Sequence, residues 1–130
     1  MIAIINASPL IYLGKIGASS LLPKLFSNCY TTNIVKREVL NQKTAPEYSI
    51  LERSFSEWLI IKKPTIQKFI KKLEKLQIHP GEATILALGK EIKEKTEEYV
   101  LIIDDLTARE IARTLELKTT GTLGILFRAL

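Results

Sequence analysis

The only two aspartates of the chain, Asp104 and Asp105, stand side by side directly after an apolar run at residues 99–103. Such a run of tyrosine, valine, leucine and isoleucine is typical of a strand that is buried on both faces. Two neighbouring carboxylates repel each other unless a cation, a helix N-terminus or a proton compensates them. Because ligands bind at the carboxyl ends of strands in open α/β sheets, the aspartate pair is the first candidate for a functional site.

Three other polar residues fall at comparable places in the chain. Asn6 comes directly after a first apolar run at residues 2–5. Glu82 lies in the first turn of a helix predicted to begin at Gly81, and Glu38 lies inside a short helix predicted after the second strand. A parallel sheet brings the ends of neighbouring strands within side-chain reach, so Asn6, Glu82 and the aspartate pair can converge.

These side chains offer only oxygen donors, and such a set favours hard cations such as Mg²⁺ or Mn²⁺. Ions of this kind assist in-line attack on a phosphodiester. Each residue also has a structural interpretation, which is the stronger one when it is taken singly. Glu82 and Asp105 can complement the positive end of a helix, Asn6 can be a turn residue, and Glu38 can be a solvated helix residue. Only joint placement at one sheet edge favours the functional interpretation.

The other reactive side chains give weaker signals. His79, the only histidine, precedes Pro80 and Gly81 and is interpreted as a turn residue. Cys29 is interpreted as a packing residue, and a single cysteine excludes an internal disulfide framework. Ser8 has no histidine placed to activate it, so it is not expected to act as a nucleophile.

The net charge of +5 is unevenly distributed along the chain. Residues 1–80 carry 12 Lys and Arg against 5 Glu, whereas residues 81–130 carry 7 against 9 Asp and Glu. This asymmetry suits an enzyme that gathers cations at one place and a polyanion around it. It is also compatible with ordinary solubility charge.

One side of an amphipathic helix predicted over residues 65–77 is apolar, and the opposite side is rich in lysine. The lysines follow helical spacing: Lys68, Lys71, Lys72 and Lys75. A solvated helix face is the first interpretation of this stripe, and a surface that contacts RNA phosphates is the second.

The hydrophobic pattern predicts strands that alternate with helices, hence a three-layer α/β domain. We expect one domain over residues 1–130, with a central, mostly parallel sheet of about four or five strands and helices on both faces. Ser8 is predicted to cap a first helix with Pro9 at its first position. No run reaches the length of a membrane span and no signal peptide is evident, so the expected location is cytoplasmic.

Five short motifs occur in the order expected of a PIN domain, and from the first to the last they span the chain almost end to end. They are INASPLI at 5–11, VKREV at 35–39, PGEA at 80–83, IDDLTAR at 103–109 and TGTLG at 120–124. The chain resembles, more narrowly, a prokaryotic PIN-like subgroup related to the VapC toxins of toxin–antitoxin systems.

This resemblance implies a PIN fold and a metal-dependent endoribonuclease that uses Mg²⁺ or Mn²⁺. It also implies RNA as the substrate, an antitoxin protein as a partner and a homodimer. Position by position, the family's first three acidic sites match Asn6, Glu38 and Glu82, and the fourth falls on Asp104 or Asp105. Polar positions near the metal site match Ser8 and Thr122.

The first acidic position of the family is usually aspartate, although asparagine occurs there in this subgroup. Asn6 keeps a carbonyl oxygen but lacks the charge, so metal binding is expected to weaken rather than vanish. The alternative hypothesis is therefore a catalytically weak PIN-like module that binds RNA or an antitoxin. A phospho-accepting receiver domain is set aside, because it needs an acidic pair after the first strand and a separate later aspartate.

Overall fold

All five strands of the computed structural model, which describes residues 1–130, run parallel in one sheet. The strands are β1 (Ile2–Ile5), β2 (Asn28–Thr31), β3 (Leu59–Ile61), β4 (Tyr99–Ile102) and β5 (Thr119–Thr120), and their order in the sheet is β3-β2-β1-β4-β5. The predicted α/β class with a parallel central sheet is confirmed.

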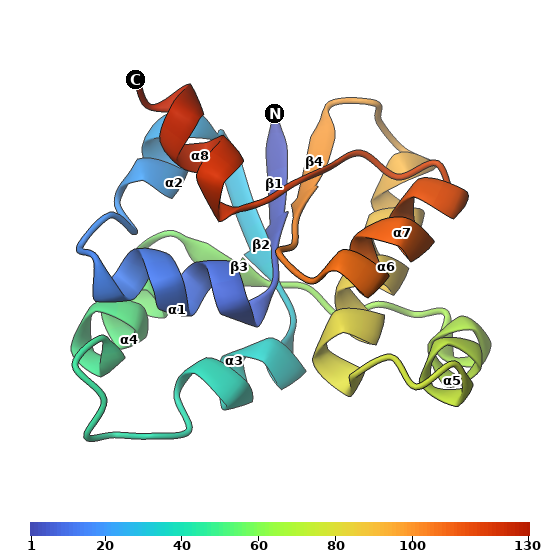
Figure 1. Ribbon diagram of the computed structural model, residues 1–130, viewed down its shortest axis with the longest axis horizontal. Coiled ribbons are helices and arrows are strands. Elements are labelled where there is room, and N and C mark those ends of the chain that lie inside the picture. Colours follow the sequence, from blue (N-terminus) through green and yellow to red (C-terminus); the bar gives the residue numbers. More distant parts are fainter.

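Helices connect every pair of consecutive strands. They are α1 (Ala7–Lys15), α2 (Leu21–Leu25), α3 (Asn33–Val39), α4 (Tyr48–Glu57), α5 (Gln67–Lys75), α6 (Pro80–Lys93), α7 (Leu106–Thr114) and α8 (Thr122–Arg128). Figure 1 shows α1, α2, α4 and α8 on one side of the sheet and α5, α6 and α7 on the other. Helix α3 lies beyond the carboxyl ends of the central strands (Figure 1).

The chain changes direction across the sheet between β1 and β4. From β1 it builds β2 and β3 on one side, and it then places β4 and β5 on the other side of β1. The segments that leave β1 and β4 therefore separate and open a crevice at the carboxyl edge. Both strands are rigid supports for this crevice, because Ala3 to Ile5 and all of β4 are buried.

Several predicted element boundaries are wrong by a few residues. Helix α1 begins at Ala7 with Asn6 as its N-cap, instead of being capped by Ser8. Pro9 fits the third helical position because the first N–H groups of a helix have no partner within it. Gly14 lies inside α1, and Gly17, with φ of 72°, follows its end. For the last strand the sequence predicts residues 117–119, whereas the structure has Thr119–Thr120.

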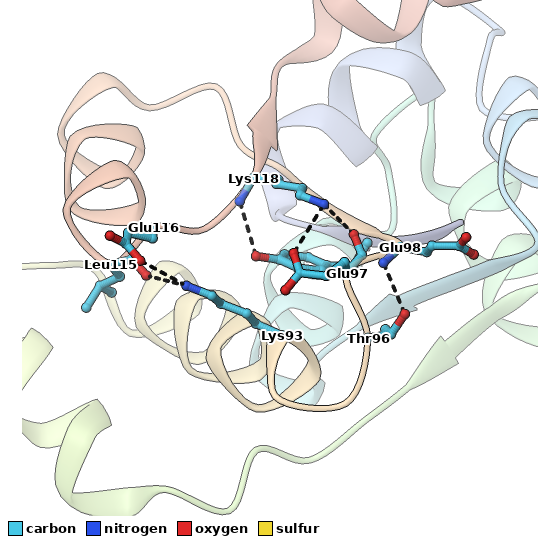
Figure 2. Close-up of polar contacts among 8 residues, drawn as sticks. Lys93, Thr96, Glu97, Glu98, Leu115, Glu116 and Lys118 are labelled. Carbon is cyan, nitrogen blue, oxygen red and sulfur yellow. Dashed lines mark hydrogen bonds and ion pairs between the residues drawn. The ribbon is translucent and has the colours of Figure 1, made fainter.

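Polar contacts fasten the opposite, amino edge of the sheet (Figure 2). Lys93 at the end of α6 donates to the carbonyl of Leu115, 3.3 Å away, and lies 3.7 Å from a carboxylate oxygen of Glu116. Lys118 contacts Glu97 through its ammonium group, and its backbone N–H donates to the hydroxyl of Tyr99. These contacts join the turns before β4 and β5, far from the crevice.

Candidate functional site

A cavity of about 250 Å³ opens at the carboxyl edge, where the chain leaves β1 and β4. We call it the carboxylate cavity; it is lined by Asn6, Ala7, Ser8, Glu38, His79, Glu82 and Asp105. Its position is the one at which open parallel sheets bind ligands. Three carboxylates and one carboxamide therefore share a single hollow.

Four different elements bring these side chains to the cavity. Asn6 follows β1 directly and is only 5 % exposed, yet its side chain makes no capping hydrogen bond to α1. Glu38 lies on α3, and Glu82 is the only acidic residue in the first turn of α6. Asp105 is the N-cap of α7.

A buried pair of threonines holds the two glutamate-bearing helices together. The hydroxyl groups of Thr32 and Thr84 lie 2.8 Å apart. Thr32 also accepts from the backbone N–H of Val35 and so caps α3, while Thr84 donates to the carbonyl of Gly81 within α6. Because these bonds fix the start of α3 against the start of α6, they help to set where Glu38 and Glu82 meet.

The two aspartates point to different places. Asp104 accepts hydrogen bonds from the backbone N–H and the hydroxyl of Thr122, at 2.7 and 2.6 Å. It therefore fastens the start of α8 to the end of β4. Asp105 accepts from the N–H of Ala108 through Oδ2, at 2.8 Å, and lines the carboxylate cavity. Of the two registers that the sequence left open, the geometry favours Asp105 for the cavity and gives Asp104 a positioning role.

A close approach between α3 and α6 delivers the carboxylate of Glu38. Oε1 of Glu38 is buried and has no hydrogen-bond partner. A Cβ atom at Gly81 would collide with this oxygen, so the absence of a side chain there leaves room for it. Nδ1 of His79 lies 3.3 Å from the same oxygen, within ion-pair range for a protonated imidazole but outside hydrogen-bond alignment.

The pKa of Glu82 lies above its ordinary value. Burial is the main cause, and the negative charge of Asp105 adds to it, whereas His79 acts in the opposite direction. Hydrogen bonding to Asp105 and the charge of Glu38 raise the pKa further. The cavity thus concentrates negative charge that its own surroundings do not neutralise.

The family model described as PIN domain matches residues 2–130. The chain belongs to the PIN-domain family. A comparison with curated protein sequences found no match. PIN domains are in general nucleases that depend on divalent metal ions, and many bind RNA and pair with antitoxins. A nuclease-type function thus follows for this PIN domain at the level of the family. None of its helices has the length and apolar character needed to cross a bilayer.

The donor chemistry of the carboxylate cavity fits the divalent cation that the PIN family uses. Carboxylate and carboxamide oxygens are the ligands that Mg²⁺ and Mn²⁺ prefer, and the unpartnered Oε1 of Glu38 is free to accept a ligand. No group of three His, Cys, Asp or Glu side chains is close enough to form a preassembled metal cluster. The cavity therefore offers single oxygens on several sides rather than a closed cage.

The remaining residues that the resemblance singled out lie around this cavity of the PIN domain or away from it. Ser8 is exposed and lines the cavity. Thr122 is buried and contacts the site only through Asp104. The lysine stripe of α5 lies outside the carboxylate cavity, and all its members are exposed: Lys68, Lys71, Lys72 and Lys75.

Sequence reasoning missed two residues of the candidate site. His79 was interpreted as a turn residue, but it lines the cavity and is the N-cap of α6. Its position three residues before Glu82 was the available signal, because N-cap and third helical residues face the same end of a helix. Gly81 was interpreted as part of the turn, and only the packing of Glu38 against it reveals its role.

Proposed function

We propose that this PIN domain is an endoribonuclease that requires Mg²⁺ or Mn²⁺. The observation that supports this most is the single cavity shared by Asn6, Glu38, Glu82 and Asp105 at the carboxyl edge of β1 and β4. Each residue comes from a different segment of the chain, which packing alone does not require. Burial and, after it, the negative charge of Asp105 raise the pKa of Glu82, and a divalent cation bound between these carboxylates would offset that charge.

In this proposal each side chain of the cavity has a defined task. Glu38, Glu82 and Asp105 would hold the cation with their carboxylates, and Asn6 would contribute its carbonyl oxygen or orient a water molecule. Such a cation, when bound, would supply a more acidic water molecule and positive charge opposite the scissile phosphate. Asp104 keeps α8 and the end of β4 in place through Thr122, and His79 orients the carboxylate of Glu38.

Cleavage of single-stranded RNA tests the proposal. With Mg²⁺ or Mn²⁺ present we expect internal cleavage that EDTA abolishes. Glu82→Gln should lower the rate at least about 100-fold, because a divalent ion supplies several kcal/mol of charge stabilisation. Equal residual activity in the natural protein and in Glu82→Gln would show a contaminating nuclease and contradict the proposal.

A second candidate function is a PIN module that binds RNA or an antitoxin with little catalysis. Asn6 favours it, because an uncharged amide stands where the family usually has aspartate, and so does the lack of a preassembled group of three ligands. In that case Asn6→Asp would create metal affinity that the natural protein lacks.

We also propose, from the family, a cytoplasmic toxin with an antitoxin partner and a homodimeric state. Exposed apolar side chains on the adjacent helices α1 and α8 offer a contact surface: Tyr12, Ile16, Leu123 and Phe127. Co-expression with the product of a neighbouring small reading frame, followed by co-purification, tests the pairing. A monomer that captures no such product would contradict it.

A further inference from the structure

Two further hollows lie in sequence beside the carboxylate cavity. A connecting hollow is lined by Ile34, Arg37, Glu38, Asn41, His79 and Pro80, so it shares Glu38 and His79 with the carboxylate cavity. A third hollow of about 500 Å³ shares Ile34 and Arg37 with the connecting hollow. The three hollows thus adjoin one another through shared lining residues, from the end of β1 along α3 to α5.

The third hollow, which we call the basic cavity, has the opposite electrostatic character. Its charged residues are Arg37, Lys62 and Lys63, opposed by the single carboxylate of Glu74. Hydroxyl and amide groups complete the lining, among them Asn33 and Gln67. Cations with nearby hydroxyl and amide groups are the usual contacts of a nucleic-acid backbone.

The loop that carries the two lysines is held in place from the helix that carries Glu82. Oε1 of Glu91 on α6 accepts from the N–H and the hydroxyl of Thr65, both at 2.5 Å, and from the N–H of Ile66 at 3.1 Å. The ammonium group of Lys62 lies 4.9 Å from the centre of the Tyr30 ring. These contacts hold the backbone next to the two lysines against α6, while Tyr30 and both lysines also line a separate hollow beside the basic cavity.

We propose that the basic cavity binds the single-stranded RNA that flanks the scissile phosphate, with Arg37 at the passage from the carboxylate cavity and Lys62 and Lys63 on the next phosphates. The inference rests on the proposed function and names the residues that would hold the strand beside the cut. A concave hollow of this size is within the range that encloses a small ligand, about 300–1,000 Å³, so it suits one splayed nucleotide.

The basic cavity is distinct from the lysine stripe predicted from the sequence. The residues of α5 that line the cavity are Gln67, Ile70 and Glu74. The stripe lysines point elsewhere on α5 and line none of the three hollows: Lys68, Lys71, Lys72 and Lys75. The strand therefore passes the inner side of α5, not its lysine-rich side.

Binding of a fluorescent 12-nucleotide single-stranded RNA to the Glu82→Gln protein tests the path without cleavage. In that background, Lys62→Ala with Lys63→Ala should weaken binding about tenfold and reduce the slope of log K against log salt by about 1.4, as expected for two lost phosphate contacts on a single strand. The matched control, Lys15→Ala with Lys24→Ala, removes two exposed lysines outside all three hollows. It should leave both quantities unchanged.

The inference is overturned if the two double variants bind alike, or if a duplex of the same sequence binds as tightly as the single strand. Its failure is distinguishable from failure of the proposed function. One outcome would refute only the proposed RNA path through the basic cavity: the natural protein cleaves RNA and Glu82→Gln does not, but Lys62→Ala with Lys63→Ala binds RNA normally. In the opposite outcome, the two lysine substitutions weaken RNA binding but the natural protein cleaves no RNA. That would refute the proposed nuclease function and support the RNA path.

Discussion

At the scale of single residues, the ionisation of Glu82 in the carboxylate cavity makes the folding stability of the protein depend on pH. Its pKa in the folded state lies above the ordinary value of 4.5, mainly because it is buried and faces Asp105. As the pH rises through the window between these two values, the unfolded chain has lost the proton while the folded chain keeps it. Folding stability therefore falls as the pH rises through this window.

Replacing Glu82 by glutamine should thus stabilise the metal-free protein at pH 7. The gain should be less than about 1 kcal/mol in the free energy of unfolding, because Glu82 is partly exposed and solvent screens its charge. The gain should disappear near pH 3, where the glutamate is protonated in both states. Urea unfolding in EDTA at the two pH values measures the effect.

Glu98→Gln provides a control for this measurement, because Glu98 is exposed in the turn before β4 and forms no ion pair. Its unfolding free energy should be the same as that of the natural protein at both pH values. A Glu82→Gln protein that is less stable at pH 7 would show that the glutamate makes a structural contact. The electrostatic account of the cavity would then be wrong.

At the scale of elements, α5 ends with a left-handed residue that its sequence did not predict. Gln77 has φ of 65°, its N–H bonds to the carbonyl of Glu74, and the N–H of Ile78 bonds to Leu73. This is the Schellman arrangement, in which glycine usually occupies the left-handed position. The sequence predicted a helix through residue 77, two residues beyond the end of α5 at Lys75, because glutamine carries no termination signal.

Gln77→Gly should raise the free energy of unfolding by about 0.5–1 kcal/mol, because a left-handed residue with a Cβ atom costs about 1–2 kcal/mol and glycine loses part of that gain in chain entropy. Thermal unfolding followed by circular dichroism measures the effect. Gln77→Ala, which keeps the Cβ atom, should show no gain. A glycine variant no more stable than the alanine variant would contradict the assigned backbone strain.

Elements with an unambiguous pattern were predictable, and those set by tertiary contacts were not. β1 and β4 are apolar at every position because both of their faces are covered, so their bounds were predicted to within one residue. The start of α1 was missed because Ser8 and Pro9 are typical of a helix start, whereas the backbone turns already at Asn6. The two-residue strand β5 was shifted because pairing with β4 decides its bounds.

At the scale of the whole molecule, the strand order explains which site residues could be predicted. Asn6 and Asp105 end two strands that neighbour each other in the sheet, so a strand-end argument predicted them. Glu38 was predicted as an acidic site only through the family resemblance. No local sequence pattern distinguishes a glutamate on the crevice side of a helix from a glutamate on its solvent side. His79 and Gly81 matter only through their contact with Glu38.

The uneven distribution of charge along the chain corresponds to two separate regions of the structure. The cations of the basic cavity all come from the basic part, residues 1–80, whereas Glu82 and Asp105 come from the acidic part. Helix α6 joins the two regions, because it carries Glu82 at its start and Glu91, which holds the lysine loop, near its end. One rigid helix thus sets the spacing between the site of cleavage and the proposed path of the strand.

Calorimetric titration of the metal-free protein with Mn²⁺ tests the central claim most directly. The account predicts that Mn²⁺ binds to the natural protein, at least about tenfold more weakly to Glu82→Gln and more tightly to Asn6→Asp, because oxygen ligands of higher charge raise affinity. Equal binding by the natural protein and Glu82→Gln, or no binding by any of the three, would contradict the assignment of a cation to the carboxylate cavity.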